Sequence, residues 1–519
     1  MRHLRAAVLA ALCLFQGVLT AAAQDITLTA PDGAVEISGT LLGFDGEFYR
    51  IDTIYGVLTV DGTGVNCEGP ACPSLTNYVA EVVISGASSM ADVLVPALVE
   101  AFALRNGYSI LRDASNDNLV LYELNNQQSG ETIARFAINA TTTDEGFADL
   151  IANEADIAMA LREIRDPEAA RAEESGLGDL RHDNRSRVLS LSALIPVTEV
   201  GNPVKSLSAL QLARVFAGKI ENWKELGGVD APISLHLPAP GSGLLQAIED
   251  ELMKPANLKL SSKVLYYPHL SDLVRSVQFD PFALGISAYE RTGGTLPMKL
   301  TGGCGHEISA TRRGIKTEDY PLSTPMYFYI PALRQPKVVR DFLRYVQSDA
   351  AQFVIRRAGY VDQASEEIPM AAQGERLVNA IGQAGKAVSI EDLQQMVVDL
   401  SPLRRLTTTF RFTAGVSELD AHSLSNVELL AQRLERGDFD GQELTFVGFS
   451  DGSGGASANL HVSLRRANRV LEAVKTASET ADLSQVTLKS SGYGEAFPVA
   501  CDDTAWGRRV NRRVEVWVR

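Results

Sequence analysis

The stretch VVISGASSM, residues 82–90, decides the fold of the largest part of the chain. It begins as an apolar strand, passes through a loop of small residues that includes Ser88 and Ser89, and opens a helical run with a regular apolar face. From about residue 81 to residue 362, strands alternate with helical segments, as in α/β domains with helices on the sheet faces. The loop is suited to an anion, because backbone N–H groups and two hydroxyls meet at a helix N-terminus. By itself it also fits an ordinary strand-to-helix connection.

Further motifs follow in a fixed order. A strand at 193–197 precedes the segments 202–207 and 222–228, and PGSG at 240–243 supplies Ser242 and Gly243. This order resembles the PstS-like periplasmic solute-binding proteins of the phosphate type. The resemblance implies two α/β lobes joined by crossover strands, which close like a hinge on a ligand. It also implies that Ser88, Ser89, Ser242 and Gly243 bind that ligand.

The ligand motifs depart from the family in two places. Family members usually carry Ser-Gly-Thr-Arg, whereas this chain has leucine at position 245, so the arginine that grips phosphate is missing. The segment 156–162 lacks the family's serine but brings Arg162, which either substitutes as the cationic group or is a solvated charge at a strand end. The expected ligand is phosphate or another small anionic solute, and the expected transport partner is an inner-membrane ABC permease.

An acidic and a basic residue are spaced for a shared site near the C-terminus. Asp451 ends a predicted strand at 444–449, and Arg466 lies in a predicted helix at 459–476. A glycine-rich loop between them lets the helix fold back, so both side chains face one cleft. Such a pair complements a zwitterion such as diaminopimelate, because arginine binds a carboxylate through two parallel hydrogen bonds.

The surrounding motifs FVGFSD (446–451), SLRRA (463–467) and GRRVNRRVE (507–515) look like the OmpA-like domain. The resemblance implies peptidoglycan binding through Asp451 and Arg466, with Asn459 and Asn511 as further binding residues. In the alternative, Asp451 caps a turn and Arg466 makes a surface ion pair. GFSDG at 448–452 formally matches a hydrolase elbow, but a glycine-rich loop follows where the elbow needs a helix, so no catalytic residue is expected.

Two patterns predict which residues are buried in this C-terminal domain. In the helix at 459–476, an apolar stripe is expected to be buried, formed by Leu460, Leu464, Ala467, Leu471 and Val474. The strand at 513–518 alternates valines with Arg513, Glu515 and Trp517, which predicts a half-buried strand. A helix is also expected to start at Ser389 as N-cap.

The N-terminal part carries export signals. Residues 1–23 combine a basic start, an apolar run and a small-residue cleavage site, as in a secretory signal peptide; a membrane anchor is the alternative, but the run falls short of about 20 residues. Cys67 and Cys72 are expected to form a disulfide in an oxidising compartment, a metal site being the alternative. Cys304 and Cys501 either pair or stay free. The net charge of −16 argues against binding to nucleic acid.

The chain of 519 residues is therefore expected to be a multidomain α/β protein. Its predicted parts are a signal peptide (1–23), a small β-rich unit (24–73), a two-lobed periplasmic-binding-protein-like α/β domain (78–365), a connector with a helix (366–405) and an OmpA-like α/β sandwich (406–519). The expected function is that of an exported periplasmic binding protein held on the cell wall at the outer membrane, without enzymatic activity, cofactor or metal. The alternative is an envelope sensor or structural scaffold that no longer binds phosphate.

Overall fold

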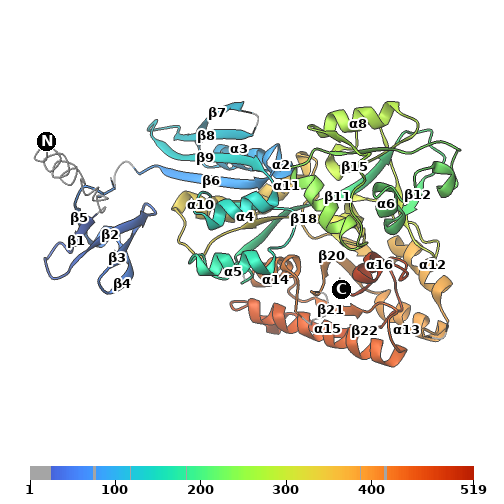
Figure 1. Ribbon diagram of the computed structural model, residues 1–519. Coiled ribbons are helices and arrows are strands. Elements are labelled where there is room, and N and C mark those ends of the chain that lie inside the picture. The colour runs from blue at the N-terminus through green and yellow to red at the C-terminus, as the bar shows by residue number, and fades with distance from the viewer. Residues whose placement is uncertain (1–24, 74–77, 117, 183, 386, 414–417) are drawn as a thin grey trace, which may run out of the picture. The chain divides into compact units, whose positions relative to one another are not determined.

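The computed structural model describes residues 25–73, 78–116, 118–182, 184–385, 387–413 and 418–519 (Figure 1). The predicted signal peptide lies outside these residues. The chain divides into two compact units. The first comprises the residues up to Glu81 with Leu124–Arg135 and Arg334–Asp341, and the second comprises the rest. No helix in the described ranges is both long and apolar enough to cross a bilayer.

The N-terminal strands of the first unit form an antiparallel sheet in the order β4-β3-β2-β1-β5. Their bounds are β1 Asp25–Thr29, β2 Glu36–Phe44, β3 Phe48–Thr53, β4 Gly56–Asp61 and β5 Asn66–Glu68. The small hydrophobic core of this N-terminal sheet consists of Ile26, Leu28, Tyr49 and Ile51. A disulfide joins Cys67 in β5 to Cys72 and closes the loop that follows the sheet.

A long mixed sheet follows, in the order β14-β13-β15-β11-β18-β10-β6-β9-β8-β7. The strands are β6 Ala80–Ala87, β7 Tyr108–Asn116, β8 Leu119–Asn126, β9 Thr132–Thr141, β10 Ile157–Ala160, β11 Ser186–Thr198, β13 Ser234–Pro238, β14 Leu265–Tyr267, β15 Ala283–Ala288 and β18 Ser323–Tyr329. Shorter strands are β12 Ser206–Ser208, β16 Leu296–Pro297 and β17 Lys299–Thr301. The helices are α2 Ser88–Ala91, α3 Leu94–Arg105, α4 Thr143–Ile151, α5 Asp166–Glu174, α6 Ala209–Phe216, α7 Gly243–Ile248, α8 Leu270–Phe279, α9 Arg312–Lys316, α10 Lys337–Tyr345 and α11 Asp349–Arg357.

This sheet has the predicted two-lobed α/β architecture. Strand β11 pairs antiparallel with β18 along its first half and with β15 along its second half. Strand β18 continues the sheet to β10, which pairs parallel with β6. We call the part built on β6–β10 the first lobe and the part built on β13–β15 the second lobe. Strands β11 and β18 are the crossovers between them.

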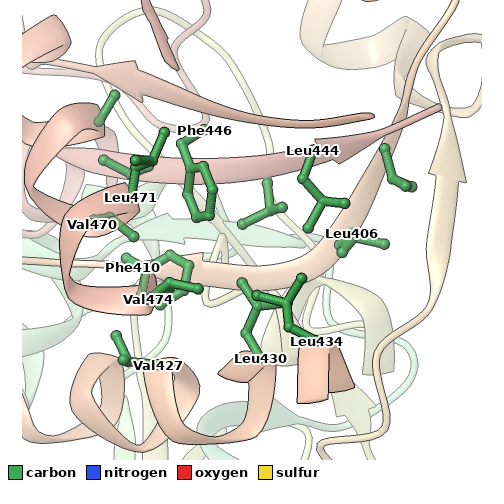
Figure 2. Close-up of a cluster of buried hydrophobic side chains, with 14 of the residues drawn as sticks. Leu406, Phe410, Val427, Leu430, Leu434, Leu444, Phe446, Val470, Leu471 and Val474 are labelled. Carbon is green, nitrogen blue, oxygen red and sulfur yellow. The ribbon is translucent and has the colours of Figure 1, made fainter. Parts of the chain in front are cut away.

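The C-terminal residues form a second α/β arrangement, with the sheet order β19-β20-β23-β21-β22. Its elements are β19 Glu367–Pro369, α12 Gly374–Gln383, α13 Ile390–Leu400, β20 Arg404–Phe410, α14 Ala421–Glu435, β21 Glu443–Phe449, α15 Ala456–Ala477, β22 Thr487–Gly492, α16 Ala505–Asn511 and β23 Arg513–Val518. Figure 2 shows side chains of α14 and α15, such as Leu430 and Val474, meeting Phe410 and Phe446 of the sheet in one apolar cluster.

Helices α12 and α13 cover the opposite face of this sheet. Leu393, Met396 and Leu400 of α13 pack with Phe449 and Trp517 in a second apolar cluster. The segment 366–405, expected to be a connector with one helix, thus contains strand β19 and two helices that pack on the sheet. Ser389 caps α13 as predicted, and its hydroxyl accepts a hydrogen bond from the amide of Asp392.

Because both faces are covered, the prediction of a half-buried last strand is wrong. Strand β23 lies between β20 and β21, and all six of its residues are buried. Alternation of apolar and polar residues normally indicates one solvated face. Here the polar residues Arg513 and Glu515 face a buried ion-pair network instead, in which Glu515 also binds Arg376 of α12.

The predicted stripe on α15 is correct only in its second half. Ala467, Leu471 and Val474 are buried, whereas Leu460 and Leu464 are 49% and 39% exposed. Asn459 and Ser463 take the buried positions in the first turns. The reason is steric, because α15 crosses the sheet there over Gly448 and Gly492, where backbone approaches backbone too closely for leucine.

Candidate binding sites

The two predicted ligand loops meet where the two lobes contact each other. Ser88 and Ser89 open α2 at the end of β6, in the first lobe, and Ser242 caps α7 in the second lobe by accepting from the amide of Leu245 at 3.2 Å. A Cβ on Gly243 would lie 3.0 Å from the Cβ of Ala87, so the loops are in direct contact. The Ser89 hydroxyl is buried and has no hydrogen-bond partner among the described residues. Buried polar groups normally have one, so this hydroxyl is available to a ligand.

A glycine fixes the first loop. Gly86 has a φ of +136°, and a Cβ there would lie 2.1 Å from the carbonyl oxygen of Met159 in β10. Only glycine lets β6 run this close to β10 just before Ser88.

Arg162 is not part of that contact. It is buried behind β10, where its guanidinium binds Glu168 at 2.7 and 2.8 Å and also pairs with Asp144. Burial opposes the charge, but Glu168 and Asp144 outweigh it and raise the pKa of Arg162 above its ordinary value. The carboxylates thus already neutralise the cation that could have replaced the missing family arginine.

Further contacts, which were not predicted from sequence, join the two lobes. Arg165 of the first lobe binds Asp250 of the second through two bonds, at 2.9 and 2.7 Å. The amide of Asp144, in the first turn of α4, donates to Gln246 of α7 at 3.3 Å. These residues lie far apart in the chain, and no local pattern marks them. The lobes are therefore closed on each other by polar contacts between their own side chains.

Asp451 and Arg466, the predicted pair near the C-terminus, form no ion pair with each other among the described residues. Asp451 follows β21 and is buried; one carboxylate oxygen accepts from the amide of Ser453, and the other binds Arg512 at 2.5 Å. Arg466, on α15, lies with its guanidinium carbon 5.3 Å from the ring centre of Phe412. No ion pair of Arg466 occurs among the described residues.

Burial and the neighbouring Arg512 lower the pKa of Arg466, while Asp451 raises it. Arg466 therefore belongs to the same electrostatic site as Asp451 and Arg512. A half-buried guanidinium without a carboxylate partner is ready to accept an anionic group. Sequence reasoning missed Arg512, although it lies in the same motif as Asn511.

Two asparagines have different roles around Asp451. Asn511 makes four hydrogen bonds, two from the amides of Val499 and Ala500 to its oxygen and two from its amide to Ala500 and Asp502. Asp502 in turn accepts from the amide of Gly452 at 2.8 Å. Asn511 therefore positions the loop beside Asp451. Asn459 is buried, and its side-chain nitrogen has no hydrogen-bond partner among the described residues.

A second disulfide joins Cys304, in the loop after β17, to Cys501, next to Asp502. It connects the second lobe covalently to the C-terminal sheet, a pairing that the sequence left open. No cluster of histidine, cysteine and carboxylate side chains suited to a metal ion occurs in the described part of the chain.

Comparisons with known proteins identify the larger part of the chain. A family model described as "PBP superfamily domain" matches residues 73–350. The chain is similar to the phosphate-binding protein PstS of Staphylococcus epidermidis, with 25% identity over 233 residues, which cover 44% of this chain and 70% of that protein. It is also similar to the PstS of Staphylococcus haemolyticus, with 26% identity over 227 residues, 42% of this chain and 69% of that protein.

Solved structures with similar parts include an ABC-type phosphate transport receptor from Vibrio cholerae, with 21% identity and a TM-score of 0.42. The match covers 54% of this chain and 99% of that chain. The periplasmic domain of Helicobacter pylori MotB is also similar to part of the chain, with 18% identity and a TM-score of 0.19. The match covers 22% of this chain and 73% of that chain.

Proposed function

The chain belongs to the PBP superfamily domain family, and from this premise we propose that it is an exported binding protein that captures a small anionic solute while held on peptidoglycan. Phosphate is the first candidate, because the similar curated proteins are named as phosphate-binding. The solute-binding domain spans 78–365 and would deliver its ligand to an inner-membrane ABC permease. The C-terminal module, 406–519, is OmpA-like and binds the cell wall.

The observation that carries the solute site is the contact of the Ser88–Ser89 loop with the Ser242–Gly243 loop between the lobes, with the Ser89 hydroxyl buried and unpartnered among the described residues. Hinge opening of the lobes would expose both loops, and closure would surround an oxyanion with hydroxyl and amide donors. Leu245 and the ion-paired Arg162 leave the two loops without the arginine that the family carries at position 245. We therefore expect weaker binding than a site with a bidentate arginine would give.

Replacing Ser89 by alanine should weaken phosphate binding about tenfold, because one charge-assisted hydrogen bond is lost. Calorimetric titration of the mature chain with phosphate measures this. Ser271→Ala, which removes an exposed hydroxyl of α8, serves as the matched control and should bind as the wild type does. If neither phosphate nor another oxyanion produces heat with the wild type, the solute-binding proposal fails.

That outcome would favour a second function, an envelope sensor or scaffold with a closed, ligand-free PBP domain. Two contacts support this candidate: Gly243 lies against Ala87, and the amide of Asp144 is bonded to Gln246 between the lobes. The first contact fills space that an anion would need, and the second uses a backbone N–H that could otherwise donate to the anion.

The wall-binding proposal depends on the division of roles around Asp451. Arg512 neutralises Asp451 in the free protein, whereas Arg466 has no carboxylate partner among the described residues. Diaminopimelate offers a carboxylate to Arg466 and an ammonium to Asp451. The side-chain amide of Asn459, which lies beside Glu495, would supply a further donor.

Arg466→Ala should abolish co-sedimentation with purified sacculi, and Asp451→Asn should weaken it about tenfold. Arg465→Ala is the matched control, since Arg465 is the exposed neighbour on the same helix. Binding of both site variants at the wild-type level would refute the assigned pair, while loss in the control as well would point to non-specific charge attraction.

A further inference from the structure

A cavity of about 500 Å³ lies where the C-terminal module covers the two lobes. Each of three parts of the larger unit contributes one wall. The first lobe supplies Glu163 and Arg165, the second lobe supplies Asp250 and Lys254, and the module supplies Asp420. The volume falls in the range of small-molecule sites, about 300–1,000 Å³.

The module binds both lobes at the rim of this cavity. The amide of Ala421 donates to Glu163 of the first lobe at 2.9 Å. Arg509 binds Glu251 of the second lobe at 2.8 Å, and the Trp506 indole donates to the backbone carbonyl of Glu251 at 2.7 Å. The third wall is therefore attached by specific contacts to both lobes.

Most charges in the cavity neutralise one another. Arg165 pairs with Asp250, Arg509 pairs with Glu251, and Glu318 binds both Arg411 and His422. Arg162, which also lines the cavity, pairs with Asp144 and Glu168. Three charged side chains of the lining have no ion pair among the described residues, and these are Glu163, Asp420 and Lys254. Glu163 and Asp420 each accept one backbone N–H, from Ala421 and Ser423 respectively.

The two unpaired acids are neighbours on the cavity wall, because the carboxylate of Glu163 accepts from the amide of Ala421, the residue that follows Asp420. Partial loss of hydration at the cavity wall and the charge of Asp420 raise the pKa of Glu163 to about 7, although the Glu163 side chain stays exposed to solvent, and the pKa of the half-buried Asp420 is raised as well. The segment 414–417 that precedes this wall is Ala-Gly-Val-Ser and carries no basic side chain. A positive group placed between the two carboxylates would supply the missing counter-charge.

We infer that this cavity is a second solute site, which binds a small zwitterion, an amino acid or short peptide, with its ammonium between Glu163 and Asp420 and its carboxylate at Lys254. Phosphate offers no ammonium and would be repelled by the two acids. The site thus differs in place and ligand chemistry from the one between the Ser88–Ser89 and Ser242–Gly243 loops. It also needs the C-terminal module, because Asp420 belongs to it.

The test is a calorimetric titration of the full mature chain with the dipeptide L-alanyl-L-alanine. Its N-acetyl form lacks the ammonium and its C-terminal amide lacks the carboxylate. We expect the dipeptide to bind, the acetylated form not to bind, and the amide to bind about tenfold more weakly. Saturating phosphate should leave the dipeptide affinity unchanged.

Glu163→Gln combined with Asp420→Asn should weaken dipeptide binding at least about tenfold, since both charges vanish while the backbone hydrogen bonds keep an acceptor oxygen. Glu174→Gln, an exposed position at the end of α5, is the matched control. Absence of dipeptide binding, equal binding of the acetylated form, wild-type affinity in the double variant, or displacement by phosphate would each overturn the inference. Loss of phosphate binding alone leaves it standing.

Discussion

Replacing Glu515 by glutamine is expected to lower the free energy of unfolding of the larger unit by about 4 kcal/mol. Glu515 is completely buried in the central strand β23. Its carboxylate binds Arg513 at 2.7 Å and Arg376 at 2.8 Å, and lies 3.4 Å from Arg405. Without this charge, Asp319, which pairs with Arg405, is the one carboxylate left to the three buried guanidinium groups in the described part of the chain.

The same network predicts how this loss depends on pH. Burial raises the pKa of Glu515, but the three arginines outweigh it and lower the pKa to about 2 from an ordinary value of 4.5. Because the folded-state pKa is depressed, the stabilisation is fully present above pH 4.5 and is lost as the pH falls towards 2. The difference in stability between wild type and variant should therefore shrink across this interval.

Urea unfolding followed by tryptophan fluorescence measures both effects, because the Trp517 indole donates to Glu515 at 3.1 Å and reports on this site. Glu472→Gln is the control. Its surface pair with Lys475 on α15 is well exposed, so its loss should change stability by less than about 0.5 kcal/mol. A Glu515→Gln protein as stable as that control would contradict the role assigned to the network.

The buried network also shows where prediction from sequence stops. The strand at 513–518 could be placed from its alternation, and its bounds agree with the structure. Its burial could not, because the residues that neutralise Glu515 include Arg376 and Arg405, which are more than a hundred positions earlier. Alternation reports the two faces of a strand but not what covers them. Only the packing of α12 and α13 makes both faces interior.

The candidate binding residues also differ in how far a local pattern could indicate them. The loop with Ser88 and Ser89 has a local strand-to-helix signature, and Ser242 was indicated by the resemblance to the PstS-like family; the fold brings the two loops together, while their role in binding stays a prediction. Arg162 could not be judged, since its partners Asp144 and Glu168 become neighbours only in the folded lobe. Likewise, the sequence indicated Asp451 and Arg466 by motif, but gave no sign that Arg512 is the ion partner of Asp451.

The position of Arg466 depends on two glycines beneath helix α15. Gly448 in β21 and Gly492 in β22 are register partners. A Cβ on Gly448 would lie 1.9 Å from the carbonyl oxygen of Ser463, and one on Gly492 would lie 2.5 Å from the amide nitrogen of Leu464. The helix backbone thus rests directly on the sheet one turn before Arg466. Asp451 follows Gly448 by three residues, so the same contact places both members of the pair.

Gly448→Ala should therefore cost about 3 kcal/mol of stability and abolish binding to sacculi. A contact of 1.9 Å cannot be relieved by a side-chain rotation, because the opposing atom belongs to the helix backbone. Helix α15 must move off the sheet by more than 1 Å, as judged from ordinary contact distances of about 3.5 Å or more, and it carries Arg466 away from Asp451.

Thermal unfolding and co-sedimentation with sacculi, measured on the same preparations, check the two effects together. Gly382→Ala is the control, since no atom lies within 4 Å of a Cβ at that exposed position in α12 and its φ is not positive. Alanine there should be neutral or slightly stabilising. A Gly448→Ala protein that melts as the control does and still binds sacculi would show that α15 does not set the geometry of the pair. A protein that is less stable but still binds at low temperature would separate the packing role of Gly448 from the positioning of Arg466.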